Sequence, residues 1–280
     1  MERPLLVSTQ WLQDHLNDPA VEIIENAWVA DSYSKAHIKG AFRVPGHPYL
    51  KKFTDNGERT RHVMAPEAFS GLCHALGLKR DKHYVIYDDY YGLFAARFWC
   101  VCRHFGLNNI SILDGSWRGW LAQGRPVSSR METPLPGTDI VVRPHACHFI
   151  GREELQSIYR EPGVQLWDTR RIGEYTGEEQ TENQRKGHIP EALNLEWTDL
   201  LTEPVSEGDP RFLKPVRDLE MMLVNLGLRR DRTIITYCQS GNRAAFCNLV
   251  LELLDYPRHR LYDASMSEWA RDESLPVETD

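Results

Sequence analysis

The sequence predicts an α/β protein built from two copies of one domain, each a parallel sheet with helices on both faces. The first observation is that the chain repeats itself, since residues 76–129 align with 226–279 and AHIKGAFRV (36–44) aligns with GHIPEALNL (187–195). Repetition with a unit of roughly 130 residues indicates a duplicated domain rather than a solenoid of short repeats. The second is that each copy alternates short apolar runs with longer amphipathic stretches, a pattern typical of βαβ units.

The apolar runs place the strands in chain order. In the N-terminal copy they are VEIIENA, HYVIYD and ISILD, and in the C-terminal copy VQLWDT, TIITYC and HRLYDA. Between the copies, the segment SSRMETPLPGTD is polar and contains two prolines and a glycine, as linkers do. We therefore predict an inactive N-terminal domain over residues 1–127, a linker over 128–142 and a catalytic C-terminal domain over 143–280.

The composition limits the kind of partner. The net charge of −7, the pI near 5.9 and the lack of a long basic block argue against a nucleic acid or a membrane surface. No apolar run is long enough to cross a membrane, and the start MERPLLVSTQ has neither the basic nor the apolar region of a signal peptide. We expect a cytoplasmic monomer that acts on small molecules.

The six cysteines of the chain form no C-x-x-C pair, so no disulfide framework is indicated. Two weak metal candidates are Cys100 with Cys102 in FWCVC, and the cluster HACH over residues 145–148. The first pair lies in a predicted helix, where residues two apart point in different directions, and the second has no matching half. We expect ordinary core or surface residues at both places and no metal site.

Cys238 stands at the end of the predicted strand TIITY, before the turn QSGN and a helix that begins near residue 243. Ligands of parallel sheets gather at such strand ends. An offset of 150 places Asp88 of the N-terminal copy at the position of Cys238. A charged residue would be a costly substitute for a packed core thiol, so this position must be partly polar. That favours a reactive thiolate over an inert buried cysteine.

A thiolate would be stable at this position. The first backbone N–H groups of a helix lack intrahelical partners, and the helix dipole is positive there. Ser240 and Gly241 allow a tight turn in which successive amides converge on an anion carried by the sulfur. Arg243 either adds a cation at the rim or caps the helix face in solvent, and the sequence leaves both open. The loop from Cys238 to Arg243 is one residue shorter than that of cysteine-dependent phosphatases and fits a single sulfur atom.

The N-terminal copy is expected to lack this cradle. At the same offset, Tyr90, Tyr91 and Leu93 take the places of Ser240, Gly241 and Arg243, and bulky side chains there should prevent the amides from converging.

These features together resemble the tandem-domain rhodanese family. The resemblance rests on the loop CQSGNR, the segments GHIPEALN and WDTR, and an N-terminal copy without the cysteine, and it covers nearly the whole chain. It is strongest with bacterial thiosulfate sulfurtransferases that have a CQ-type loop. It implies that Cys238 takes the sulfane sulfur of thiosulfate as a persulfide and passes it to cyanide or a thiol, with no cofactor.

The resemblance also implies the substrate-binding residues. Arg170 matches the arginine of the family's D-x-R motif and should hold the donor's anionic end, whereas Asp168 fixes local structure. The loop would contribute Gln239, Ser240, Gly241, Asn242 and Arg243. Trp28 and Trp197 either line a cleft or belong to the core.

Some features keep other readings open. Glu191 replaces the glycine of the family's H-I-P-G-A segment, so that turn should differ. The alternatives to a thiosulfate sulfurtransferase are a 3-mercaptopyruvate sulfurtransferase, whose loops typically differ from CQSGNR, and a persulfide carrier that serves a biosynthetic partner without turnover.

Overall fold

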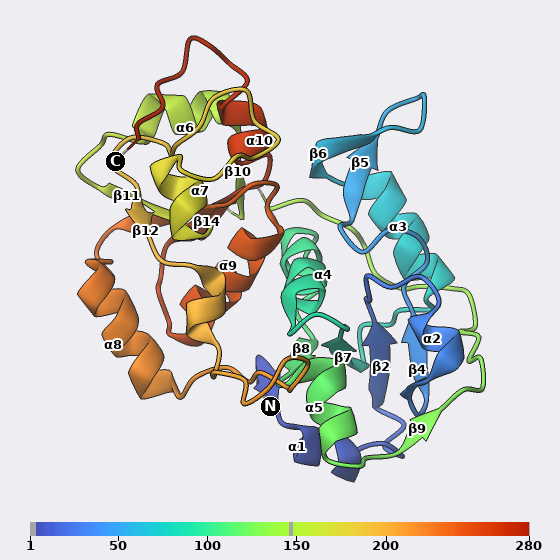
Figure 1. Cartoon of the computed structure of the whole chain (residues 1–280). Coiled ribbons are helices and arrows are strands. Elements are labelled where there is room, and N and C mark those ends of the chain that lie inside the picture. The colour runs from blue at the N-terminus through green and yellow to red at the C-terminus, as the bar shows by residue number, and fades with distance from the viewer. Residues whose placement is uncertain (1–3, 146–147, 280) are drawn as a thin grey trace. The chain divides into compact units, whose positions relative to one another are not determined.

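The computed structural model of the chain describes residues 4–145 and 148–279, which form two compact units (Figure 1). The first unit contains Met1–Leu50, Met64–His145 and Thr202–Leu213, and the second contains Lys51–Val63, Ala146–Leu201 and Lys214–Asp280. Each unit therefore takes in one segment from the other half of the chain. The boundary at residue 127 expected from the sequence lies inside the first unit.

The first unit is built on a five-stranded sheet in which every neighbouring pair is parallel. In sheet order its strands are β1 (Leu6–Val7), β8 (Ile110–Leu113), β7 (His83–Tyr87), β2 (Val21–Glu25) and β4 (Ala41–Arg43). Its helices are α1 (Thr9–Asp14), α2 (Ser32–Lys35), α3 (Pro66–Ala75), α4 (Leu93–His104) and α5 (Ser116–Ala122). A short antiparallel pair, β3 (His37–Ile38) with β9 (Val127–Ser128), completes it.

The second unit repeats this plan with a second five-stranded parallel sheet. In sheet order its strands are β10 (Phe149–Ile150), β14 (His259–Tyr262), β13 (Thr233–Tyr237), β11 (Val164–Asp168) and β12 (Leu193–Asn194). Its helices are α6 (Arg152–Ile158), α7 (Ile172–Thr176), the 3-10 helix η1 (Trp197–Leu200), α8 (Val216–Leu226), α9 (Asn242–Leu253) and α10 (Met266–Trp269). The hairpin of β5 (Lys51–Phe53) and β6 (Arg59–Val63) also belongs to it.

The central strands are buried because helices cover them. All five residues of β7 are buried, as are the last four of β13, so their apolar side chains pack into the cores. Matching order and direction of the strands in both units confirm the predicted duplicated α/β fold.

The segment 128–142, expected to be a linker, is hydrogen-bonded along the first unit. The Gly137 amide donates to the His74 carbonyl at 2.8 Å, and the Thr138 hydroxyl donates to the Leu78 carbonyl at 2.7 Å. These bonds attach the segment to α3 and the turn that follows it.

The aligned segments around His37 and His188 form the same local structure. The His37 ring stacks on Tyr33 at 3.8 Å and its Nδ1 lies 2.6 Å from the Tyr33 carbonyl. The His188 ring stacks on Tyr175 at 3.6 Å, with Nδ1 2.9 Å from the Tyr175 carbonyl. The sequence repeat in these segments therefore reflects a repeated contact.

The turn after these histidines has a left-handed residue in both copies, although Glu191 replaces glycine in the second. Gly40 in the first unit has φ of 84°, and Glu191 at the aligned position of the second has φ of 65°. A side chain in this left-handed region costs roughly 1–2 kcal/mol. The fold thus holds the backbone of Glu191 in the left-handed conformation that glycine adopts most easily.

Exchanging these two residue types should have opposite effects on stability. We expect Glu191→Gly to stabilise the second unit by up to about 1 kcal/mol, because relief of strain exceeds the entropy that glycine loses on folding. The exposed contact of Glu191 with Arg160 at 3.7 Å contributes little. The matched change Gly40→Glu should destabilise the first unit by about 1 kcal/mol, since a Cβ there meets no atom within 4 Å and only the conformation is unfavourable. Thermal unfolding of both variants measures this, and shifts in the same direction would contradict it.

Candidate active site

Cys238 lies between β13 and α9, in a loop that directs a backbone amide at its sulfur. The Gly241 N–H donates to Cys238 Sγ at 3.0 Å, and the Cys238 side chain is buried. Gly241 caps α9 with φ of 86°, and a Cβ at this position would lie 2.4 Å from Asp263 Oδ1. Only glycine fits here, so the amide contact depends on this residue.

The start of α10 holds the loop from the other side. The Cys238 amide donates to Ser265 Oγ at 3.1 Å. The Met266 and Ser267 amides donate to the carbonyls of Cys238 and Gln239, each at 3.0 Å. The peptide groups on both sides of the thiol are therefore fixed.

The polar side chains of the loop differ in their surroundings. Gln239 and Asn183 exchange two hydrogen bonds through their amide groups, at 2.7 and 3.0 Å. Ser240 is half-buried, whereas Asn242 is buried and its Oδ1 has no hydrogen-bond partner among the described residues. The Gln239 contact thus positions the loop through Asn183, which the sequence analysis missed.

Arg243 has a carboxylate partner that the sequence did not indicate. Its guanidinium binds Glu174 of α7 in a two-pronged ion pair, at 2.6 and 2.9 Å. Burial opposes the charge of Glu174, but Arg243 outweighs this effect and holds the pKa of that carboxyl below its usual value. Arg243 is therefore not a cap in solvent, and its role as a cation beside the loop stays a prediction.

Asp88 shows that the cradle does form in the N-terminal copy, so the expectation of a failed cradle was wrong. Asp88 Oδ1 accepts the amides of Tyr90 and Gly92, each at 2.8 Å. Its Oδ2 accepts the amides of Phe94 and Ala95, at 2.7 and 2.9 Å. Bulky side chains do not prevent this, because all four contacts are made by the backbone.

The error lay in the alignment across the loop. Gly92 caps α4 with φ of 90°, just as Gly241 caps α9 with φ of 86°. The copies are offset by 150 in the strand and by 149 in the helix, so the N-terminal loop has one residue more. Phe94, not Leu93, therefore corresponds to Arg243.

Arg170, predicted from the D-x-R motif to hold the donor, is buried and paired within the second unit. Its side chain is 1% exposed, with Nη2 2.6 Å from Asp168 Oδ2 and 2.8 Å from the Gly187 carbonyl. Burial opposes its charge, but Asp168 outweighs this effect and raises the pKa of Arg170. The buried pair joins the end of β11 to the segment before His188, and removing one partner would leave the other charge buried.

The two tryptophans have different surroundings. Trp197 is buried and packs edge-on against Phe246 at 5.3 Å, as a core residue does. Trp28 is 50% exposed and stacks on Phe94 and Tyr49 of the first unit, at 5.7 and 5.4 Å. The core reading therefore holds for Trp197 and not for Trp28.

Lys51 is a further residue of the loop's surroundings that the sequence did not indicate. Its ammonium lies 2.5 Å from Asp263 Oδ1 and 2.8 Å from the Arg61 carbonyl, and the pair is buried. A Cβ on Gly241 would lie 3.2 Å from the same ammonium. The β5–β6 hairpin is thus anchored directly beside the loop that holds Cys238.

Comparison with known proteins agrees with this geometry. The model of the rhodanese-like domain matches residues 8–123 and 151–272, one match for each copy. The chain belongs to the rhodanese-like family. The crystal structure of SseA from Escherichia coli has the same fold, with a TM-score of 0.78 and 30% identity over 95% of this chain and 100% of that one.

Two similar rhodanese-family relatives differ in the donor that their names state. The 3-mercaptopyruvate sulfurtransferase of Escherichia coli (strain K12) is 32% identical, over 99% of both chains. The thiosulfate sulfurtransferase of Azotobacter vinelandii is 31% identical, over 98% of this chain and 97% of its own. Their shared activity supports a sulfurtransferase here.

Another relative is named for carrying sulfur. The sulfur carrier protein TtuD of Thermus thermophilus is 29% identical, over 98% of this chain and 96% of its own.

No group of three potential metal-binding side chains occurs in the described part of this rhodanese-family chain. Cys100 and Cys102 are buried in α4. Ala146 and Cys147 of the HACH cluster lie outside the described residues.

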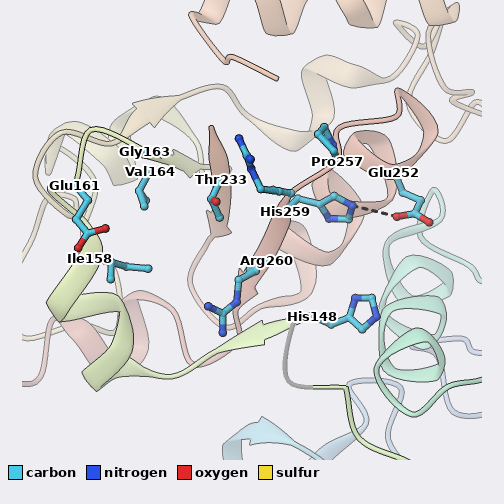
Figure 2. Close-up of a pocket in the computed structure, with 11 residues that line it drawn as sticks. His148, Ile158, Glu161, Gly163, Val164, Thr233, Glu252, Pro257, His259 and Arg260 are labelled. Atoms are coloured by element: carbon cyan, nitrogen blue, oxygen red, sulfur yellow. Dashed lines mark hydrogen bonds and ion pairs between the residues drawn. The ribbon is translucent and has the colours of Figure 1, made fainter. Parts of the chain in front are cut away.

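A cavity of 600 Å³ opens at the opposite end of the second sheet from Cys238 (Figure 2). Val164, Thr233 and His259 line it, each the first residue of its strand. The His259 ring lies between Asn248 Oδ1 at 2.6 Å and Glu252 Oε2 at 3.1 Å. This end of the sheet is remote from the thiol.

Replacing the carboxylate of Asp88 tests the cradle of the N-terminal copy. We expect Asp88→Asn to destabilise the first unit by about 2–4 kcal/mol, because an NH2 group would face amides that need an acceptor. Urea unfolding measures the loss, and hydrogen exchange at Phe94 and Ala95 localises it. The exposed Asp55→Asn is the control and should change stability by less than about 0.5 kcal/mol. A loss below about 1 kcal/mol for Asp88→Asn would contradict the role of these bonds.

Proposed function

We propose that the protein transfers a sulfane sulfur through a persulfide on Cys238, and that thiosulfate is its donor. The observation that carries this proposal is the Gly241 amide directed at Cys238 Sγ at 3.0 Å, at the start of the 12-residue helix α9. Converging amides and the positive end of a helix favour an anionic sulfur.

The reaction proceeds in two nucleophilic steps. The thiolate of Cys238 attacks the outer sulfur of thiosulfate, the sulfur–sulfur bond breaks, and sulfite leaves with the electron pair. The acceptor, cyanide or a thiolate, then attacks the outer sulfur of the Cys238 persulfide. The acceptor keeps that sulfur and the Cys238 thiolate is regenerated.

Asp88 supports the persulfide as the state that the cradle holds. A carboxylate oxygen of aspartate is two bonds from Cβ, and so is the outer sulfur of a cysteine persulfide. The amides of Phe94 and Ala95 bind Asp88 Oδ2, and their counterparts in α9 belong to Arg243 and Ala244. The carboxylate of Asp88 in the first unit thus occupies the place that the persulfide anion of Cys238 would take in the second unit.

The donor assignment rests on which groups of the loop already have partners. Gln239 is bound to Asn183 and Arg243 to Glu174, so these side chains are not reserved for a ligand. Thiosulfate is a compact dianion that requires amides and little else, whereas mercaptopyruvate also needs fixed partners for its carboxylate and ketone. The loop therefore favours the smaller donor.

Two other functions have specific support. The 3-mercaptopyruvate sulfurtransferase of Escherichia coli covers nearly the whole chain at 32% identity. The similarity to the sulfur carrier TtuD favours a carrier that is loaded by a partner. A carrier would load one sulfur and turn over poorly with small donors.

Parallel steady-state kinetics with the two donors and cyanide decide the donor. We expect kcat/KM for thiosulfate to exceed that for 3-mercaptopyruvate by at least about tenfold, equivalent to roughly 1.4 kcal/mol in the transition state. A preference for mercaptopyruvate would overturn the donor and leave the persulfide mechanism standing.

Substitution of the two cysteines of this region tests the nucleophile. Cys238→Ser should lower turnover at least about 100-fold without unfolding the protein, because a serine hydroxyl stays protonated at neutral pH. Cys247 is fully buried in α9 and desolvation raises the pKa of its thiol, so Cys247→Ala should keep most of the activity. Intact mass after thiosulfate treatment should show one added sulfur in the Cys247 variant and none in the Cys238 variant. Equal loss of activity in both variants would contradict the assignment.

A further inference from the structure

A cavity of 580 Å³ lies between the β5–β6 hairpin and the start of α10, entirely within the second unit. Its lining is rich in guanidinium groups. Among the lining residues are Arg59, Arg61, Arg152, Arg271, Ser267 and Glu268.

Two of these arginines have no ion pair among the residues that the structure describes. Arg152 lies 3.2 Å from Asp272, and His62 lies 3.6 Å from Glu268, so two of the acidic groups lining the cavity have basic partners. Within residues 4–145 and 148–279, Arg61 and Arg271 have no acidic partner at ion-pair distance, and Arg61 Nε is buried without a hydrogen-bond partner.

The electrostatic environment of Arg61 agrees with this arrangement. Burial and then the charge of Arg271 lower the pKa of Arg61, and the carboxylates of Glu182 and Glu268 oppose this shift without cancelling it. An anionic group placed between Arg61 and Arg271 would relieve their repulsion and supply the missing acceptor.

The cavity adjoins the loop of Cys238 on two sides. Ser267 lines it, and the amide of that residue donates to the Gln239 carbonyl at 3.0 Å. On the other side, Lys51 of the hairpin binds the Arg61 carbonyl and reaches Asp263 beside Gly241. A ligand in the cavity would therefore lie a few residues from the reacting sulfur.

We propose that this arginine cavity binds a carboxylate of the thiol that accepts sulfur from Cys238. The inference rests on the persulfide function proposed above and specifies the class of acceptor, a peptide-sized thiol that carries carboxylates. Arginine is suited to this role because its guanidinium binds a carboxylate through two parallel hydrogen bonds.

The location of the cavity favours the acceptor over the donor. In thiosulfate the anionic oxygens are bound to the sulfur next to the one that reacts, so they must stay within the loop. A charged group at Arg61 requires a molecule whose thiol and carboxylate are separated by several bonds. A tripeptide spans on the order of 10 Å when extended, which suits two sites separated by a few residues.

The test uses the full-length protein and glutathione as the carboxylate-bearing probe. The double variant Arg61→Met, Arg271→Met removes both charges and keeps the apolar part of each side chain. The reaction has two half-reactions, so kcat/KM for each substrate reports its own step. We expect kcat/KM for glutathione to fall at least about tenfold, while the values for 2-mercaptoethanol, cyanide and thiosulfate stay within about twofold.

Arg258→Met is the matched control, because this arginine lines the cavity at the opposite end of the sheet. It should leave all four values unchanged. An equal fall for glutathione and 2-mercaptoethanol, a fall for thiosulfate, or no change in the double variant would each overturn the proposal.

A binding measurement separates this inference from the proposed function. S-methylglutathione has the carboxylates but no free thiol, and calorimetry should show binding to the wild-type protein that weakens at least about tenfold in the double variant. Binding should also weaken with added salt, as expected for a contact between charges. Absence of binding to the wild-type protein would refute the site whatever the outcome of the sulfur-transfer assays.

Discussion

The convergence of backbone amides at the end of a central strand is the constraint on which the rest of this structure depends. Amides can converge only where a parallel strand ends against the first turn of a helix and a glycine permits the left-handed cap. Gly92 and Gly241 supply that cap with nearly equal φ values, 90° and 86°. Three features hold the two backbones that form it: the packing of both sheets, Ser116 at the start of α5 with Ser265 before α10, and the buried ion pair of Asp168 with Arg170.

The two units fill the same cradle with different chemistry. In the first unit a carboxylate satisfies four amides permanently, which removes the need for a ligand and makes the loop a structural element. In the second unit the shorter cysteine side chain accepts the Gly241 amide. The side chain of Cys238 reaches one bond less far than that of Asp88, and the proposed persulfide would make up this difference.

Sequence reasoning succeeded where a signal is local or repeated. The alternation of apolar runs indicated the sheets, and the repeat placed Cys238 at a strand end. Prediction from the sequence failed where a contact joins segments that are distant along the chain. Glu174 and Asn183 lie 69 and 56 residues from their partners in the loop, and no spacing rule connects them.

The remaining errors have specific physical causes. An alignment without a gap conceals the extra residue before Gly92, so it pairs the wrong residues of the two loops. It also compares side chains, whereas the cradle is formed by backbone amides. Arg170 matched a motif, but a motif does not show whether a guanidinium faces solvent or a buried carboxylate. Ser265 could have been found, because Ser116 stands at the matching place in the other copy and makes the same contact with the residue at the cradle.

The exchange of segments between the units affects how the chain is made. Residues Lys51–Val63 belong to the second unit and Thr202–Leu213 to the first. During translation the first unit cannot close until residue 213 has left the ribosome, because Phe212 packs against Gly115 and the Leu213 amide binds Asp114. Conversely, the hairpin that carries Lys51 is synthesised long before Asp263 exists. The two copies of the duplicated gene can therefore no longer be separated into independent genes without loss of part of each product.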